Sequence, residues 1–160
     1  MCIRDRSYGA EVVLEGETVA TSLRLAAEFA ERTGAVIIHP FDHRDVVIGQ
    51  GTLGLELLED APDVDTIVLG IGGGGLIAGV AAAGKAKAAE LGRSVRIIGV
   101  QAENAAAMIP SLEAGYPVDI ETKPTIADGI LVARPGAIPF EIIKDLSLIH
   151  ISEPTRRRGI

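Results

Sequence analysis

The stretch TIVLGIGGGGLIAG, residues 66–79, decides the fold of this chain. It opens with a continuous apolar run, which is typical of a strand buried on both faces of a parallel sheet. Four consecutive glycines follow, and the alanine-rich run Leu76–Leu91 then predicts a helix that ends near Gly92. A strand, a loop and a helix in this order form the repeating unit of α/β folds.

The four glycines predict a binding site for a phosphate group. Backbone without Cβ atoms can take positive φ angles and approach a ligand closely, and successive N–H groups can converge on an anion. The start of the next helix adds free N–H groups and the positive end of its dipole. No lysine or arginine lies in the loop, so backbone groups alone would hold the anion. A flexible surface turn is the alternative, although each glycine costs roughly 0.5–1 kcal/mol relative to alanine.

The spacing around the loop narrows the kind of phosphate. Gly70, Gly72 and Gly75 satisfy the G-x-G-x-x-G pattern of dinucleotide sites, which also requires an acidic residue about 20 positions later. The nearest acid beside the next strand, Glu103, follows Gly75 by 28 positions. No Lys-Ser or Lys-Thr pair follows the loop, which excludes an ATP-type P-loop. A single phosphate on a small cofactor fits better, with a dinucleotide-binding module as the alternative.

Strands and helices alternate on both sides of this unit. The apolar patterns predict strands at Ala10–Leu14, Ala35–His39, Thr66–Ile71 and Val95–Val100. They predict helices at Val19–Thr33, Thr52–Glu59, Leu76–Leu91, Ala105–Ala114 and from about Pro139. We expect Gly34 to end the first helix, Thr52 to cap the second, and Pro40–Gly51 to be irregular. The alternation predicts an α/β fold, a parallel sheet with flanking helices.

The two ends of the chain are interpreted as adapter-derived. If residues 1–5 are encoded by ATGTGTATAAGAGAC, the opposite DNA strand encodes Ser-Leu-Ile-His, which is residues 147–150. One piece of DNA in two orientations, such as a transposon-end sequencing adapter, therefore accounts for both ends. A natural basic tail at Arg156–Arg158 is the alternative. We exclude residues 1–6 and 147–160 from the fold argument, and expect an internal fragment of a longer protein.

Composition limits the function classes. Five of the 15 basic and two of the 22 acidic residues lie in the excluded ends, so 10 basic and 20 acidic residues remain. This acidic balance argues against nucleic-acid binding. The one cysteine, Cys2, is also excluded, which leaves no disulfide or thiolate site. No apolar run reaches the roughly 18 residues of a membrane span, so we expect no membrane partner and a cytoplasmic location.

Four motifs, in the same order, resemble the threonine/serine dehydratases among the fold-type II pyridoxal-phosphate enzymes. The loop run IGGGGLIAG, residues 71–79, resembles their tetraglycine loop. The other motifs are HPFD at 39–42 with GQGTLGLE at 49–56, GVQAE at 99–103, and TIADGI at 125–130 with RPG at 134–136. The resemblance extends from Ser7 to about Leu146 and implies part of a tryptophan-synthase-β-like fold. It divides the chain into the end of a small α/β subdomain, 7–43, and part of the large cofactor-binding subdomain, 44–146.

The resemblance implies that pyridoxal 5′-phosphate is the cofactor. Its phosphate would accept hydrogen bonds from the backbone N–H groups of Gly72, Gly73, Gly74, Gly75 and Leu76. Gly129, with Asp128 adjacent, would lie beside the pyridine ring. The Schiff-base lysine would lie upstream of this chain, so no catalytic residue is assigned within it. Lys85 and Lys87 are interpreted as a solvated helix face, and His39 and His43 as structural.

The implied activity of the intact protein is β-elimination of threonine or serine to a 2-oxo acid and ammonia, in amino-acid metabolism such as isoleucine biosynthesis. The intact protein is expected to be a homo-oligomer that binds a small amino-acid substrate. Serine racemase or a cysteine-synthase-like activity are the alternatives within the fold. Some family members bind a divalent cation at positions that align with Gln101, Ala105 and Ala107, and the absence of carboxylates there predicts no metal.

Overall fold

The computed structural model describes residues 3–16, 18–146 and 148–151. It divides into two compact units, Met1–Ile37 and Ile38–Ile160, which are taken in turn. Cys2, residue 147 and Arg156–Arg158, all within the ends interpreted as adapter-derived, lie outside the described residues. Across the ranges described, no helix is long and apolar enough to cross a membrane.

The first unit contains α1, Ile3–Ser7, and α2, Val19–Thr33. The Thr18 side chain caps α2 by accepting a hydrogen bond from the N–H group of Thr21 at 3.2 Å. Gly34 ends the helix with φ 74°, and its N–H group donates to Ala30 O at 2.8 Å. The predicted helix and its terminating glycine are therefore confirmed. No residue of α2 is buried, so its apolar stripe lacks a covering partner among the described residues.

The two strands predicted at Ala10–Leu14 and Ala35–His39 are wrong, because neither segment is paired into a sheet. A strand needs a neighbour for its N–H and C=O groups, and the described part of the chain supplies none to these segments. Their apolar side chains point to solvent, with Val36 90% and Ile38 80% exposed. Apolar sequence predicted strands here, but pairing depends on a partner that sequence pattern does not reveal.

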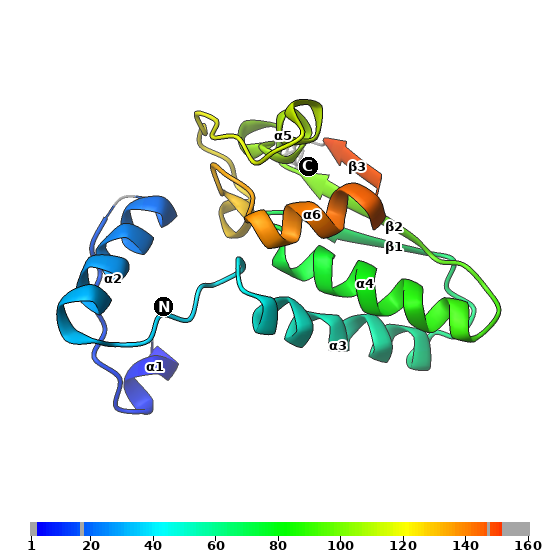
Figure 1. Ribbon diagram of the computed structural model, residues 1–160, viewed down its shortest axis with the longest axis horizontal. Helices are drawn as coiled ribbons and strands as arrows, with labels where there is room; N and C mark the ends of the chain where they lie inside the picture. Colours follow the sequence, from blue (N-terminus) through cyan, green and yellow to red (C-terminus); the bar gives the residue numbers. More distant parts are fainter. Residues whose placement is uncertain (1–2, 17, 147, 152–160) are drawn as a thin grey trace, which may run out of the picture. The chain divides into compact units, whose positions relative to one another are not determined.

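The second unit is a three-stranded parallel sheet with helices packed on it. Its strands, in the spatial order β1-β2-β3, are β1 Thr66–Gly70, β2 Arg96–Gln101 and β3 Leu148–Ile151. Its helices are α3 Arg44–Asp60, α4 Gly75–Glu90, α5 Met108–Ala114 and α6 Ala137–Leu146, with 3-10 turns η1 Glu103–Ala105 and η2 Asp128–Ile130. Figure 1 shows α4 and α6 crossing the same face of the sheet, and α3 running along α4. The predicted α/β fold with a parallel sheet is confirmed.

The strand β3 falls within the segment interpreted as adapter-derived. It pairs with β2 in parallel, from Ile98 opposite Leu148 to Gln101 opposite Ile151. Parallel pairing uses backbone N–H and C=O groups, which every residue except proline supplies in full. The pairing is therefore compatible with either origin of these residues, and the adapter interpretation stays a prediction.

Burial of β1 on both faces, which the apolar run predicted, is wrong for the described chain. Ile67 is 6% exposed, whereas the next residue, Val68, is 60% exposed. Adjacent side chains on a strand point to opposite faces, so one face is covered and the other is open. The helices α4 and α6 supply the cover on one side only (Figure 1).

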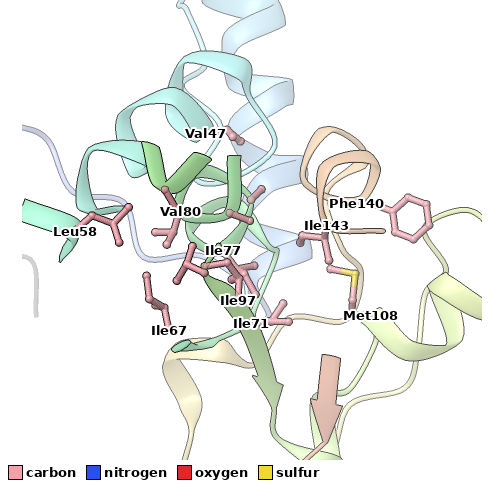
Figure 2. Packing of buried hydrophobic residues seen from close by; sticks show 14 residues of the cluster. Val47, Leu58, Ile67, Ile71, Ile77, Val80, Ile97, Met108, Phe140 and Ile143 are labelled. Atoms are coloured by element: carbon pink, nitrogen blue, oxygen red, sulfur yellow. The ribbon is translucent and has the colours of Figure 1, made fainter. Parts of the chain in front are cut away.

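The core lies between the covered sheet face and the helices. Figure 2 shows Ile71, Ile77 and Ile97 converging beneath α4, with Met108 and Ile143 beside them. All five of these side chains are at most 1% exposed. Because Ile71 immediately precedes the glycine loop and Ile77 follows it, the core holds both ends of that loop.

The helix α3 begins at Arg44, although the sequence predicted irregular chain to Gly51 and a helix from Thr52 capped by that threonine. The cap is His43, whose Nδ1 accepts a hydrogen bond from Asp45 N at 3.2 Å. Gly51 and Gly54 of α3 lie where this helix meets α4. A methyl group at Gly79 of α4 would overlap Val47 O and lie 2.6 Å from Gly51 N. These glycines serve close helix packing rather than a turn.

Replacing Gly79 with alanine should therefore lower the free energy of unfolding, because the two helix backbones would have to separate. We expect a loss of about 1–3 kcal/mol, the range for overpacked cores. Gly84→Ala is the matched control on the same helix, since its methyl group would meet Gly54 only at 3.9 Å. Urea denaturation should show the control unchanged or up to about 1 kcal/mol more stable. Equal stability of the Gly79→Ala variant and the parent chain would contradict the close contact.

Candidate functional site: the glycine loop

The glycine loop, Gly72–Gly75, connects β1 to α4, as the sequence predicted, and Gly75 is the first residue of α4. Ile71 N donates to Val100 O at 2.8 Å, which extends the β1–β2 pairing to the first residue before the glycines. Gly74 caps α4 with φ 97°, in the left-handed region, and is the only one of the four glycines with a positive φ. The loop therefore joins the carboxyl end of a strand to the amino end of a 16-residue helix.

A run of six N–H groups, from Gly72 to Ile77, finds no hydrogen-bond acceptor within the described ranges. The first intrahelical bond of α4 starts later, from Ala78 N to Gly74 O at 3.0 Å. Unpaired N–H groups at a helix start, together with the helix dipole, favour an anion. Gly73, Gly74 and Gly75 are buried, so these donors would hold an anion in a partly desolvated place.

The other side of the loop is closed by protein. A methyl group at Gly73 would overlap the ring of Phe41, and one at Gly75 would lie 3.1 Å from Phe41 Cα and Cβ. A methyl group at Gly74 would lie 2.9 Å from Ile143 and Pro139. From the sequence, the glycines are explained by positive φ angles and by the close approach of a ligand. The structure adds that Phe41 and α6 pack against the loop so closely that side chains are excluded.

The loop is fixed to the segment before α6 by one of its carbonyl groups. Gly73 O accepts a hydrogen bond from Gly136 N at 2.9 Å, just before α6. The Asp42 carboxylate accepts hydrogen bonds from Ala137 N and Ile138 N, both at 2.9 Å, and so caps α6 from 95 residues away in sequence. Asp42 thereby fixes the start of α6, next to Gly136, which donates to the loop.

His39 supports the same corner. Its Nδ1 accepts hydrogen bonds from Asp42 N at 2.8 Å and Phe41 N at 3.3 Å, and its ring contacts the Phe41 ring edge-on with centroids 4.7 Å apart. The structural role expected for His39 is what the described contacts show. The supporting roles of Phe41, Asp42 and Gly136 were missed, although all three lie in the quoted motifs HPFD and RPG.

The turn η2 brings the second predicted site segment to the loop. A methyl group at Gly72 would lie 3.2 Å from Val132 and 3.3 Å from Ile130 Cα. Asp128 and Gly129, at the start of η2, are both exposed. Open space surrounds the Cβ direction of Gly129 among the described atoms. The segment is therefore adjacent to the loop, and its two predicted site residues are exposed.

Leu76 and Lys87 are further residues that the sequence analysis named. Leu76 is half-buried in the first turn of α4. Lys87 lies near the far end of α4 and donates to Glu90 at 3.2 Å. No three His, Cys, Asp or Glu side chains gather as a possible metal site in residues 3–16, 18–146 and 148–151.

Removing the Asp42 carboxylate should loosen the connection between α6 and the loop. We expect Asp42→Ala to lower the unfolding free energy by about 1–2 kcal/mol, the usual cost of losing a capping side chain. Asp63→Ala is the matched control, because Asp63 is exposed and no interaction of its side chain is found among the described residues. The two variants are compared by chemical denaturation. If both lose the same stability, Asp42 does not act as the cap of α6.

The chain is similar to known proteins of one family. Residues 3–157 match the family described as pyridoxal-phosphate dependent enzymes. The L-threonine ammonia-lyase of Thermotoga maritima is 48% identical over 141 residues, which cover 88% of this chain and 34% of that protein. This chain therefore spans about a third of the length of that relative.

Solved structures show the same relationship. Processed threonine deaminase isoform 2 of Solanum lycopersicum has a TM-score of 0.82 at 37% identity, covering 92% of this chain and 42% of that one. Maize serine racemase has a TM-score of 0.81 at 34% identity, covering 92% and 44%. The predicted resemblance to threonine/serine dehydratases of fold type II is confirmed.

Proposed function

Because the chain belongs to the family of pyridoxal-phosphate dependent enzymes, we propose that the backbone N–H groups of Gly72–Leu76 bind the phosphate of that cofactor. The observation that carries this proposal is the run of N–H groups without acceptors at the start of α4. Donor geometry of this kind holds a phosphate without a cationic side chain. Gly129 and Asp128 are proposed to lie beside the pyridine ring, since η2 packs against Gly72.

The complete protein is proposed to be an ammonia-lyase that converts threonine or serine to a 2-oxo acid. The cofactor, when bound, supplies an electron sink for loss of the α-proton. The residues of this chain bind and orient its phosphate and keep one side of the loop closed to water through Phe41. The lysine that attaches the cofactor is proposed to lie outside this chain, since none of Lys85, Lys87, Lys123 and Lys144 matches a family motif.

The names of the relatives support a lyase acting on threonine. Those of Thermotoga maritima and Solanum lycopersicum are named for threonine ammonia-lyase and threonine deaminase activity. A serine racemase is the second candidate, favoured by the maize structure. The absence of carboxylates at Gln101 and Ala107 favours the lyase, because a cation site there would need them. A homo-oligomer in the cytoplasm, acting in amino-acid metabolism such as isoleucine biosynthesis, completes the proposal.

A chimeric enzyme tests this function. Residues 7–146 replace the matching segment of the Thermotoga maritima relative, which supplies the rest of the fold. We expect the chimera to form a 2-oxo acid and ammonia from L-threonine, measured by a coupled dehydrogenase assay. The 160-residue chain alone should form none, because it lacks the attaching lysine.

One variant and two alternative outcomes make the chimera informative. Gly74→Ala in the chimera should weaken cofactor affinity by about tenfold or more. Alanine at φ 97° is strained by roughly 1–3 kcal/mol, so the free loop would relax to another conformation and misdirect its N–H groups. Serine racemisation without 2-oxo acid formation would instead support the second candidate. A folded chimera that binds the cofactor but transforms neither amino acid would refute both.

A further inference from the structure

Gln101 is the last residue of β2, and its side chain reaches Ile71, the residue before the glycine loop. It is one of two buried polar side chains among the described residues, the other being Ser111, and both are 0% exposed. Burying an amide costs free energy unless hydrogen bonds compensate it. A buried glutamine at this place therefore needs a role that methionine or leucine could not fill.

Three hydrogen bonds connect Gln101 to three segments. Oε1 accepts from Met108 N at 2.9 Å, at the start of α5. Nε2 donates to Ile71 O and to Ala105 O, each at 3.4 Å. The orientation of the amide follows from its partners, since a backbone N–H can only donate and the two carbonyl groups can only accept.

The bond to Ile71 O bears directly on the loop. The carbonyl of Ile71 and the N–H group of Gly72 belong to one planar trans peptide, so they point in opposite directions. Holding the Ile71 carbonyl toward Gln101 therefore fixes the direction of the first N–H group of the loop. Gly136 N acts in the same way on Gly73 O, and so on the N–H group of Gly74.

We propose that Gln101 is a positioning residue, whose amide sets the Gly72 peptide in the orientation that binds the cofactor phosphate. This inference rests on the phosphate site proposed above and extends it to a residue that does not touch the ligand. The role depends on an uncharged group that donates toward Ile71 O and accepts from Met108 N. A glutamine satisfies both, whereas a carboxylate can only accept.

The difference between an amide and a carboxylate provides a test that depends on pH. Gln101→Glu keeps the shape but loses the donors while its carboxylate is ionised. A protonated carboxyl regains one O–H donor, and burial raises the pKa of such a group toward neutrality or above. Gln101→Met has a similar length and cannot donate at any pH. The first variant should therefore recover phosphate binding on acidification and the second should not.

The experiment uses the 160-residue chain and 4′-deoxypyridoxine 5′-phosphate, which has no aldehyde to react with surface lysines. Affinity is measured by calorimetry between about pH 5.5 and 9 and divided by the value of the parent chain at each pH. Glu103 and Glu113, the exposed acids on η1 and α5, are common to all three proteins and cancel in that ratio. Unphosphorylated 4′-deoxypyridoxine serves as the ligand control.

At the highest pH both variants should bind about tenfold more weakly, the effect expected of one hydrogen bond to a charged group. At the lowest pH the ratio for Gln101→Glu should approach one, while that for Gln101→Met stays low. Affinity for the unphosphorylated analogue should not change. If Gln101→Met fails to fold, the affinities of Gln101→Glu at the lowest and highest pH still test the proposal. Far-ultraviolet circular dichroism shows whether Gln101→Glu is folded at both.

Parent-like affinity of a folded variant at high pH, or a ratio for Gln101→Glu that does not change with pH, would overturn the role of Gln101 alone. Equal binding of the phosphorylated and unphosphorylated analogues by the parent chain would overturn the phosphate site, and the role of Gln101 with it. The two failures are thus distinguishable.

Discussion

The closeness of Phe41 to the glycine loop is the constraint on which the rest of the site depends. The ring occupies the space that a side chain at Gly73 would need, and a methyl group at Gly75 would lie 3.1 Å from the Phe41 backbone. Protein closes one side of the loop in this way, while six N–H groups from Gly72 to Ile77 keep no acceptor in the described chain. A loop that excludes side chains on one side and offers donors is suited to hold an anion by backbone alone.

The loop is held in place by hydrogen bonds from other segments to its carbonyl groups, rather than by its own sequence. Glycine is the most flexible residue, so four in succession would be a poor choice for a preorganised site without outside support. Gln101 and Gly136 hold the carbonyls of Ile71 and Gly73. Asp42 in turn fixes the start of α6 next to Gly136. Preorganised donors bind more tightly because less entropy is lost on binding.

The sequence predicted those features that depend on local pattern. It located α2 with its end at Gly34, and the strand, loop and helix from Thr66 onward, because apolar periodicity and glycine punctuation act within one element. It misjudged the start of α3, because the run from Pro40 to Gly51 is polar and lacks a regular apolar pattern. Gly51 and Gly54 instead lie against the backbone of α4, a packing reason that no single segment contains.

Long-range partners set the other limits of prediction. The segments 10–14 and 35–39 have the composition of strands, but a strand forms only where another chain segment pairs with it. The supports of the loop, Asp42 and Gln101, act over 95 and 30 residues of sequence. The motifs of the family resemblance located the loop, and they also include Asp42 and Gln101. The contacts of these two residues become visible only in the folded chain.

The most direct test of the central claim is a titration of the isotopically labelled chain with inorganic phosphate, followed by amide nuclear magnetic resonance. If backbone groups at the start of α4 bind the anion, the largest shifts will be those of the Gly72 to Leu76 amides, and they will saturate together. Shifts confined to the surroundings of surface lysines and arginines, with the loop amides unmoved, would contradict the account.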